Sequence, residues 1–162
     1  MTKLLISGCL FGDDVRYDGK NSSLQKNELF IRIKNKVELI VFCPEVQGGL
    51  STPRLPSEIQ SINPYMIKNS KNEDTTQYFL HGAQKTLQLC QENNIKIALL
   101  KSNSPSCSND LTYNGNFDKI LLKQKGVTAE LLLRNNVLVF NENQLDELDK
   151  YLKNHSILPN IQ

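Results

Sequence analysis

Short apolar runs alternate with longer polar segments along the chain, and this pattern predicts four strands and four helices. Each strand is predicted where a run is short, continuous and rich in β-branched residues, at residues 3–8, 38–43, 95–101 and 137–140. Each helix is predicted where apolar residues recur at helical spacing, at residues 24–35, 75–93, 127–135 and 143–153. Apolar runs without polar alternation are typical of parallel strands that are buried on both faces.

The order of these elements predicts an α/β fold, with a small and mainly parallel sheet flanked by helices in a Rossmann-like arrangement. We expect a single domain at residues 1–153 and a loosely packed C-terminal tail at residues 154–162. Long loops follow three of the predicted strands, at residues 10–23, 44–72 and 102–126. Loops of that length are usually functional, and in a parallel sheet ligands bind where the strands end.

Composition narrows the class of protein. Hydrophobic residues make up 39% of the chain and no apolar run is long enough to span a bilayer, so we expect a soluble protein without a membrane partner. The net charge is +2 and no basic stripe with interleaved aromatic residues is present, so a nucleic-acid partner is possible but not favoured. Met1–Lys3 leads straight into a predicted strand rather than into a signal peptide, which favours a cytoplasmic location.

Three of the four cysteines follow predicted strands. Cys9, Cys43 and Cys107 are separated by 33 and 63 residues, so the sequence holds no local metal-binding motif. They could be small buried side chains, or they could meet in one metal or catalytic site at the edge of the sheet. Three thiolates suit a soft metal, whereas structural zinc would need a fourth ligand. Cys90 falls on the apolar face of a predicted helix and is interpreted as structural.

Polar residues near these cysteines are candidates for catalysis. Glu45 lies two residues after Cys43 and would face the same side in an extended segment, where it could move protons. It could equally be an exposed loop acid. Three serines precede the third cysteine and could relay protons, donate hydrogen bonds or only form a turn: Ser102, Ser104 and Ser106.

Other residues are candidates for substrate binding. The pair Gly48 and Gly49 would let backbone N–H groups approach a ligand closely. Arg16 and Arg54 carry forked donors that suit a carbonyl, a carboxylate or a phosphate, although each could be an ordinary surface arginine.

Several sequence blocks together resemble the thiouracil desulfurase (TudS-like) family, which was formerly catalogued as a domain of unknown function. The blocks run in the same order over residues 4–142, nearly the whole chain. They comprise Cys9–Leu10, Arg16–Gly19, Cys43–Glu45, Gly48–Leu50, Thr52–Arg54, Pro56–Ile59, Leu100–Ser102, Ser104–Cys107 and Gly126–Ala129. Such a series is far more specific than the spacing of the cysteines.

The resemblance implies a [4Fe-4S] cluster bound by Cys9, Cys43 and Cys107, with one iron left open. It implies that this iron takes the sulfur of a small thiolated pyrimidine and releases it as sulfide, replacing C=S by C=O without net electron transfer. It also implies catalytic roles for Glu45 and Ser102. Backbone groups at the glycine pair and at the Ser104–Ser106 turn would then hold the substrate ring.

The sequence departs from the family pattern at three positions. Ser108 stands where many relatives have glycine after the third cysteine, and Val15 stands where many have a cysteine. Asn103 is unusual between two serines and is expected to affect the choice of substrate.

Two other functions compete with a desulfurase. The same cluster could serve a sulfide carrier without hydrolytic turnover. Alternatively, the cysteines could hold structural zinc in a module whose glycine-rich loop binds an anion.

Overall fold

The predicted strands pair into one parallel sheet. The computed structural model describes residues 1–155, and in spatial order the strands of this sheet are β2 (Val37–Phe42), β1 (Thr2–Ser7), β5 (Ile97–Leu99) and β8 (Leu138–Phe140). The predicted α/β fold is confirmed. The C-terminal tail predicted from residue 154 begins inside a helix that runs to His155, and the rest of that tail lies outside the described residues.

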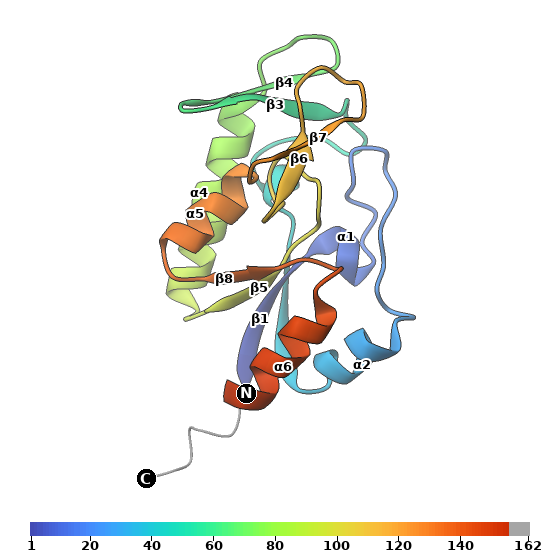
Figure 1. Cartoon of the computed structure of the whole chain (residues 1–162), viewed down its shortest axis with the longest axis vertical. Coiled ribbons are helices and arrows are strands. Elements are labelled where there is room, and N and C mark those ends of the chain that lie inside the picture. The colour runs from blue at the N-terminus through green and yellow to red at the C-terminus, as the bar shows by residue number, and fades with distance from the viewer. Residues whose placement is uncertain (156–162) are drawn as a thin grey trace.

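Both faces of the sheet are covered by helices, as the unbroken apolar runs indicate (Figure 1). Leu4 and Ile6 of β1 pack on one face with α2 (Glu28–Lys34) and α6 (Leu145–His155). Leu5 points to the opposite face, because successive side chains of a strand alternate. That face is covered by α4 (Thr76–Glu92) and α5 (Val127–Arg134). None of the helices within residues 1–155 is long and apolar enough to cross a membrane.

The register of the strands aligns their carboxyl ends at one edge. Ser7 at the end of β1 pairs with Phe42 at the end of β2, and Leu99 of β5 pairs with Phe140 of β8. Two short helices start at this edge: α1 (Gly8–Phe11) directly follows β1, and α3 (Pro44–Gln47) follows β2 after Cys43. Residues far apart in the sequence are thereby delivered to the same place.

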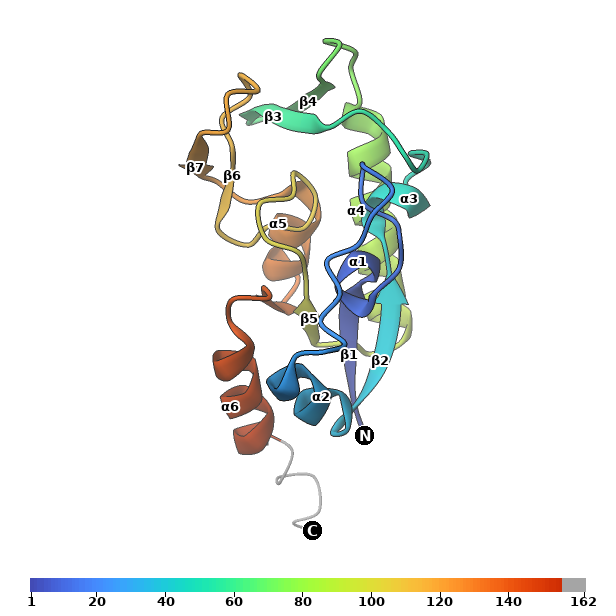
Figure 2. The same ribbon diagram turned by 90° about the vertical axis from the view of Figure 1, so that its right-hand side faces the viewer.

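Two of the predicted loops contain short antiparallel hairpins. The first pairs β3 (Ser57–Ile62) with β4 (Tyr65–Asn69), and the second pairs β6 (Leu111–Tyr113) with β7 (Leu121–Lys123). The hairpin strands bury few apolar residues. Only the first hairpin contributes buried apolar side chains, Ile59 and Ile67, to a small core shared with α4 and α5. Both hairpins lie beyond the carboxyl edge of the sheet (Figures 1 and 2).

Candidate functional site

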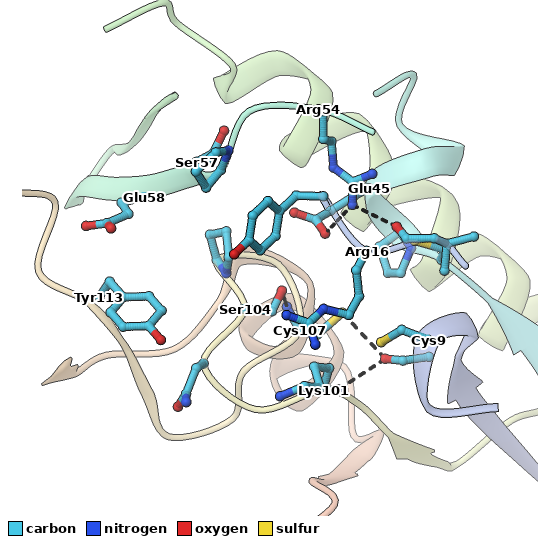
Figure 3. Close-up of a pocket in the computed structure, with 18 of the residues that line it drawn as sticks. Cys9, Arg16, Glu45, Arg54, Ser57, Glu58, Lys101, Ser104, Cys107 and Tyr113 are labelled. Carbon is cyan, nitrogen blue, oxygen red and sulfur yellow. Dashed lines mark hydrogen bonds and ion pairs between the residues drawn. The ribbon is translucent and has the colours of Figure 1, made fainter. Parts of the chain in front are cut away.

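A cavity of about 560 Å³ lies between the carboxyl edge of the sheet and the two hairpins (Figure 3). Its floor, as we call the residues that follow β1, β2 and β5, carries the three cysteines. Its roof consists of the two hairpins with the segments that flank them. Of the predicted site residues, eight line the cavity: Cys9, Arg16, Cys43, Glu45, Arg54, Ser102, Ser104 and Cys107.

The three cysteines reach the floor from three different strands. Cys9 lies in the first turn of α1, and Cys43 occupies the position just before α3. Cys107 lies in the turn after β5, and the Ser7 hydroxyl donates to its sulfur at 3.7 Å. All three are free thiols, and Cys9 and Cys107 are buried. The fold therefore gathers three thiols that the sequence keeps far apart.

The loop that carries Cys107 is held by the start of α5. The backbone N–H groups of Thr128 and Ala129 donate to the Ser106 carbonyl oxygen at 2.8 Å and 3.2 Å. Gly126 allows this close approach, because a Cβ atom there would lie 2.5 Å from the Ser106 carbonyl carbon and 2.9 Å from the Cys107 nitrogen. The position of Cys107 thus depends on a helix that belongs to another part of the chain.

Two of the predicted substrate-binding serines shape this loop. The Ser104 hydroxyl oxygen accepts from the backbone N–H groups of Ser106 and Cys107 at 3.0 Å and 2.9 Å. The Ser106 hydroxyl is buried against that of Thr128 at 2.8 Å, and Ser106 does not line the cavity. The structure therefore places Ser106 outside the cavity lining, as a residue that joins the Cys107 loop to α5.

Burial governs the chemistry of the free thiols. Burial, followed by the neighbouring Cys43 thiol, raises the pKa of Cys9 to about 12. Burial likewise raises the pKa of Cys43 and of Cys107. Cysteines that act as nucleophiles have lowered pKa values, so these three are unsuited to attack a substrate as free thiols. A metal ligand loses its proton when the metal binds, and this role fits the set.

Glu45 is clamped by Arg54. An Arg54 Nη2 hydrogen is donated to a Glu45 carboxylate oxygen at 2.9 Å, and the same nitrogen donates to the Val15 carbonyl at 3.0 Å. The Nη1 atom donates to the carbonyl of Ser51 and the hydroxyl of Thr52. The Arg54 side chain is only 7% exposed, against 19% for Glu45. The Arg54 guanidinium therefore donates its hydrogen bonds to other groups of the protein, and it forms an ion pair with the Glu45 carboxylate.

The backbone around Glu45 differs from the expected extended segment, so that expectation was wrong. Residues Pro44–Gln47 form the helical turn α3, in which the Cys43 carbonyl oxygen accepts from the Gln47 N–H at 3.0 Å. Proline favours this geometry at the first position of a helix, where its missing N–H costs nothing. Cys43 and Glu45 nevertheless both line the cavity.

Gly48 and Gly49 do not line the cavity, so the structure does not bring them together with the other predicted site residues. A side chain on Gly48 would strike the Tyr78 carbonyl oxygen, and one on Gly82 would strike the Pro44 carbonyl oxygen. Gly49 has φ +110° and lies against the Tyr78 ring. The glycines allow α3 and α4 to pack backbone against backbone, which fixes the segment that carries Cys43 and Glu45.

Ser102 has a partner that the sequence did not reveal. Glu142 accepts from the Ser102 backbone N–H at 2.8 Å and from its hydroxyl at 3.0 Å. Lys101 Nζ lies 2.8 Å from the same carboxylate. Burial favours the protonated form of Glu142, but the Lys101 and Ser102 hydrogen bonds outweigh it and lower its pKa. One signal was available: Glu142 lies two residues after the last predicted strand, at the same edge of the sheet.

Further residues of the cavity come from the roof and from the loop after α1. Glu58 is buried, and one of its carboxylate oxygens accepts from the N–H groups of Gly115 and Phe117 at 3.0 Å and 3.1 Å. This ties the first hairpin to the turn of the second, which places Tyr113 and Phe117 on the cavity wall. Arg16 lies at the cavity one-third exposed, with its guanidinium near Ser22 and Asp18.

A parallel α/β fold that gathers three free thiols, a clamped carboxylate and a paired serine in one cavity defines an enzyme site at the carboxyl edge of a sheet. The chain belongs to the 2-thiouracil desulfurase family, a family of enzymes, whose family model matches residues 4–144. The family resemblance predicted from the sequence blocks is thereby confirmed.

Two relatives match nearly the whole chain. The uncharacterized protein YbbK of Bacillus subtilis (strain 168) is 35% identical over 152 residues, which cover 90% of this chain and 99% of the relative. The solved structure of TudS, a [4Fe-4S]-dependent thiouracil desulfidase, is 39% identical and has a TM-score of 0.86. That match covers 94% of this chain and 99% of the TudS chain.

Proposed function

We propose that this protein removes sulfur from a thiolated pyrimidine, replacing C=S by C=O and releasing sulfide, with a [4Fe-4S] cluster held by Cys9, Cys43 and Cys107. The observation that carries the proposal is the convergence of three free thiols with Glu45 and Ser102 in one cavity of a desulfurase-family fold. The resemblance to TudS, which is a [4Fe-4S]-dependent thiouracil desulfidase, supports the choice of cofactor.

The arrangement of the thiols fits a cluster better than a single metal ion. Within residues 1–155, no three Cys, His, Asp or Glu side chains converge closely enough to hold one ion. In a cubane cluster each thiolate binds an iron of its own, so the sulfurs need not meet at a point. This geometry disfavours the structural-zinc alternative. When bound, the cluster would supply a soft Lewis acid at the one iron without a cysteine ligand.

The chain's own residues would move the protons of the hydrolysis. The overall reaction adds water across C=S and releases hydrogen sulfide, and no electrons are transferred. Glu45 lies at the floor in an orientation fixed by Arg54, so it can exchange a proton with water or with the departing sulfur. Ser102 presents a hydroxyl at the same floor and can relay a second proton.

The proposed substrate is a free base or a nucleoside. The aromatic side chains of Tyr113 and Phe117 line the cavity, and such rings suit a flat heterocycle. Specificity would then follow recognition of the ring, and turnover would not need RNA. The free cysteines favour a reducing compartment, and we infer a cytoplasmic location on that basis.

A turnover assay on anaerobically reconstituted protein tests the proposal. The protein is incubated with 2-thiouracil, 4-thiouracil and their nucleosides, and both loss of the thiopyrimidine and sulfide are counted. Many sulfides per protein indicate a desulfurase, whereas a burst of about one indicates a sulfide carrier. Activity confined to intact thiolated tRNA would contradict the small-molecule substrate and leave the cluster unaffected.

A further inference from the structure

Glu142 lies beside the floor on the turn that follows β8, at the end of the fourth parallel strand. Its carboxylate binds Ser102 through two hydrogen bonds, one from the backbone N–H and one from the hydroxyl. Lys101 Nζ binds the same carboxylate at 2.8 Å and lies 3.4 Å from the Ser102 hydroxyl oxygen. Ser102, Glu142 and Lys101 therefore form one cluster in which each side chain contacts the other two.

The turn that carries Glu142 is itself fixed. Gln144 accepts from the Asn141 N–H at 3.0 Å, and Asn141 accepts from the Asn143 N–H at 2.8 Å. The Asn109 amide joins this turn to the loop after Cys107 by donating to Gln144 at 2.8 Å. Since side chains and backbone brace one another, the Glu142 carboxylate is held in place before any substrate binds.

The direction of the hydrogen bonds decides what Ser102 can do. The Ser102 hydroxyl donates its hydrogen to Glu142 and accepts one from Lys101 Nζ at 3.4 Å, so one lone pair of its oxygen remains available to the cavity. Within residues 1–155, no hydrogen bond joins Ser102 to Glu45, whose carboxylate is bound by Arg54. The Glu45 carboxylate therefore accepts from Arg54, whereas the Glu142 carboxylate accepts the hydroxyl hydrogen of Ser102.

We propose that Glu142 is the positioning residue for Ser102, and that it receives the hydroxyl proton of Ser102 when Ser102 accepts a proton from the attacking water. This inference rests on the proposed function. One proton passes from water to the Ser102 oxygen while the original hydroxyl proton of Ser102 passes to Glu142. The proton on Glu142 later leaves with sulfide or to solvent, so the protons balance. Lys101 keeps the carboxylate ionised and ready for the next cycle.

Glu142→Gln separates hydrogen-bond direction from shape. In either orientation the amide NH₂ faces a donor, which is the Ser102 N–H on one side or the Lys101 ammonium and the Ser102 hydroxyl on the other. The neutral amide therefore cannot serve all three donors, and the Ser102 hydroxyl has no carboxylate to take its proton. We expect kcat to fall by roughly 10–100-fold, with KM changed less than about twofold. Glu142→Asp keeps the charge and should recover part of the lost kcat.

A double-mutant cycle shows whether Glu142 acts through Ser102. In the Ser102→Ala background, Glu142→Gln should lower kcat by less than about twofold, because the hydroxyl that it serves is gone. Iron content and cluster absorbance should stay at the wild-type level in all variants. Glu130→Gln, on an ion-paired glutamate of α5 outside this cavity, is the matched control and should leave kcat unchanged.

The thermal unfolding midpoints of the same four proteins form a second cycle that needs no turnover. The Ser102 and Glu142 substitutions should again be non-additive, because they remove the two ends of one hydrogen bond. Equal losses of kcat from Glu142→Gln in both backgrounds, unchanged kcat, or additive midpoints would each overturn the inference. A wild-type holoenzyme without turnover would refute the proposed function, while the midpoints would still decide whether Ser102 and Glu142 are coupled.

Discussion

The floor and the roof of the cavity are built in different ways. The floor follows the ends of paired parallel strands, and its loops are locked onto α4 and α5 at Gly48, Gly82 and Gly126. The roof consists of two short hairpins joined through the Glu58 carboxylate. If the proposed function is right, the reacting groups lie on loops anchored to α4 and α5, and the surface that would meet the rest of the substrate lies on hairpins with a small core.

If the floor holds the cofactor, then removing one thiol should have the largest effect. We expect Cys43→Ser to abolish bound iron and turnover, because a serine hydroxyl is a much poorer ligand for iron than a thiolate. Iron content and visible absorbance of anaerobically prepared protein measure this. Cys90→Ser is the control and should leave the iron in place, since Cys90 lies on α4 with its side chain buried in the core. Full iron in Cys43→Ser would remove this residue from the ligand set.

A change of chemistry at the floor comes next. Glu45→Gln should retain the cluster and lower kcat by ~10²–10⁴-fold, which is the usual contribution of a general acid or base. Steady-state kinetics with matched iron content measures the effect. Glu38→Gln, on an exposed glutamate of the edge strand β2, supplies the comparison. Normal turnover by Glu45→Gln would make Glu45 a structural partner of Arg54.

A change of packing at the floor should act more moderately. Gly126→Ala puts a methyl group against the Ser106 and Cys107 backbone, and overpacking of this kind costs ~1–3 kcal/mol. We expect a lower unfolding midpoint together with reduced iron content, because the Cys107 loop must move. In Gly19→Ala the cost comes from a φ of +75° with open space around it, so stability should fall while iron is retained. Equal iron in both variants would show that the floor is more adaptable than its packing indicates.

A substitution in the roof should give the smallest effect, and it should act on substrate binding. Glu58→Ala removes the acceptor of two backbone N–H groups in the second hairpin, so Tyr113 and Phe117 lose their fixed position. We expect KM to rise several-fold while kcat and iron content stay within about twofold. Glu58→Gln keeps an accepting oxygen and should be milder. A large loss of kcat in Glu58→Ala would show that the roof also controls the chemistry.

The floor was more predictable from sequence than the roof, for a physical reason. Strands buried on both faces are continuous apolar runs, so β1, β2, β5 and β8 were located to within two residues at each end. The ends of β1, β2 and β5 placed the cysteines at one edge. The strands of the hairpins bury only two apolar side chains, Ile59 and Ile67, and two positions are too few to form a recognisable strand pattern. The partners of Glu45 and Ser102 lie 9 and 40 residues away, and only the folded chain brings Arg54 and Glu142 to them.

The spread of the three cysteines over three strands has a consequence for maturation. If these cysteines are the cluster ligands, a chain that has not yet paired β1 with β2 and β5 has isolated thiols and no assembled site for the cluster. Cofactor insertion must then follow folding, and a cofactor that binds only the folded state adds its own binding free energy to the stability of that state. Substitutions far from the cavity that merely loosen the sheet should therefore be most damaging before the cofactor is inserted, during biosynthesis or iron limitation.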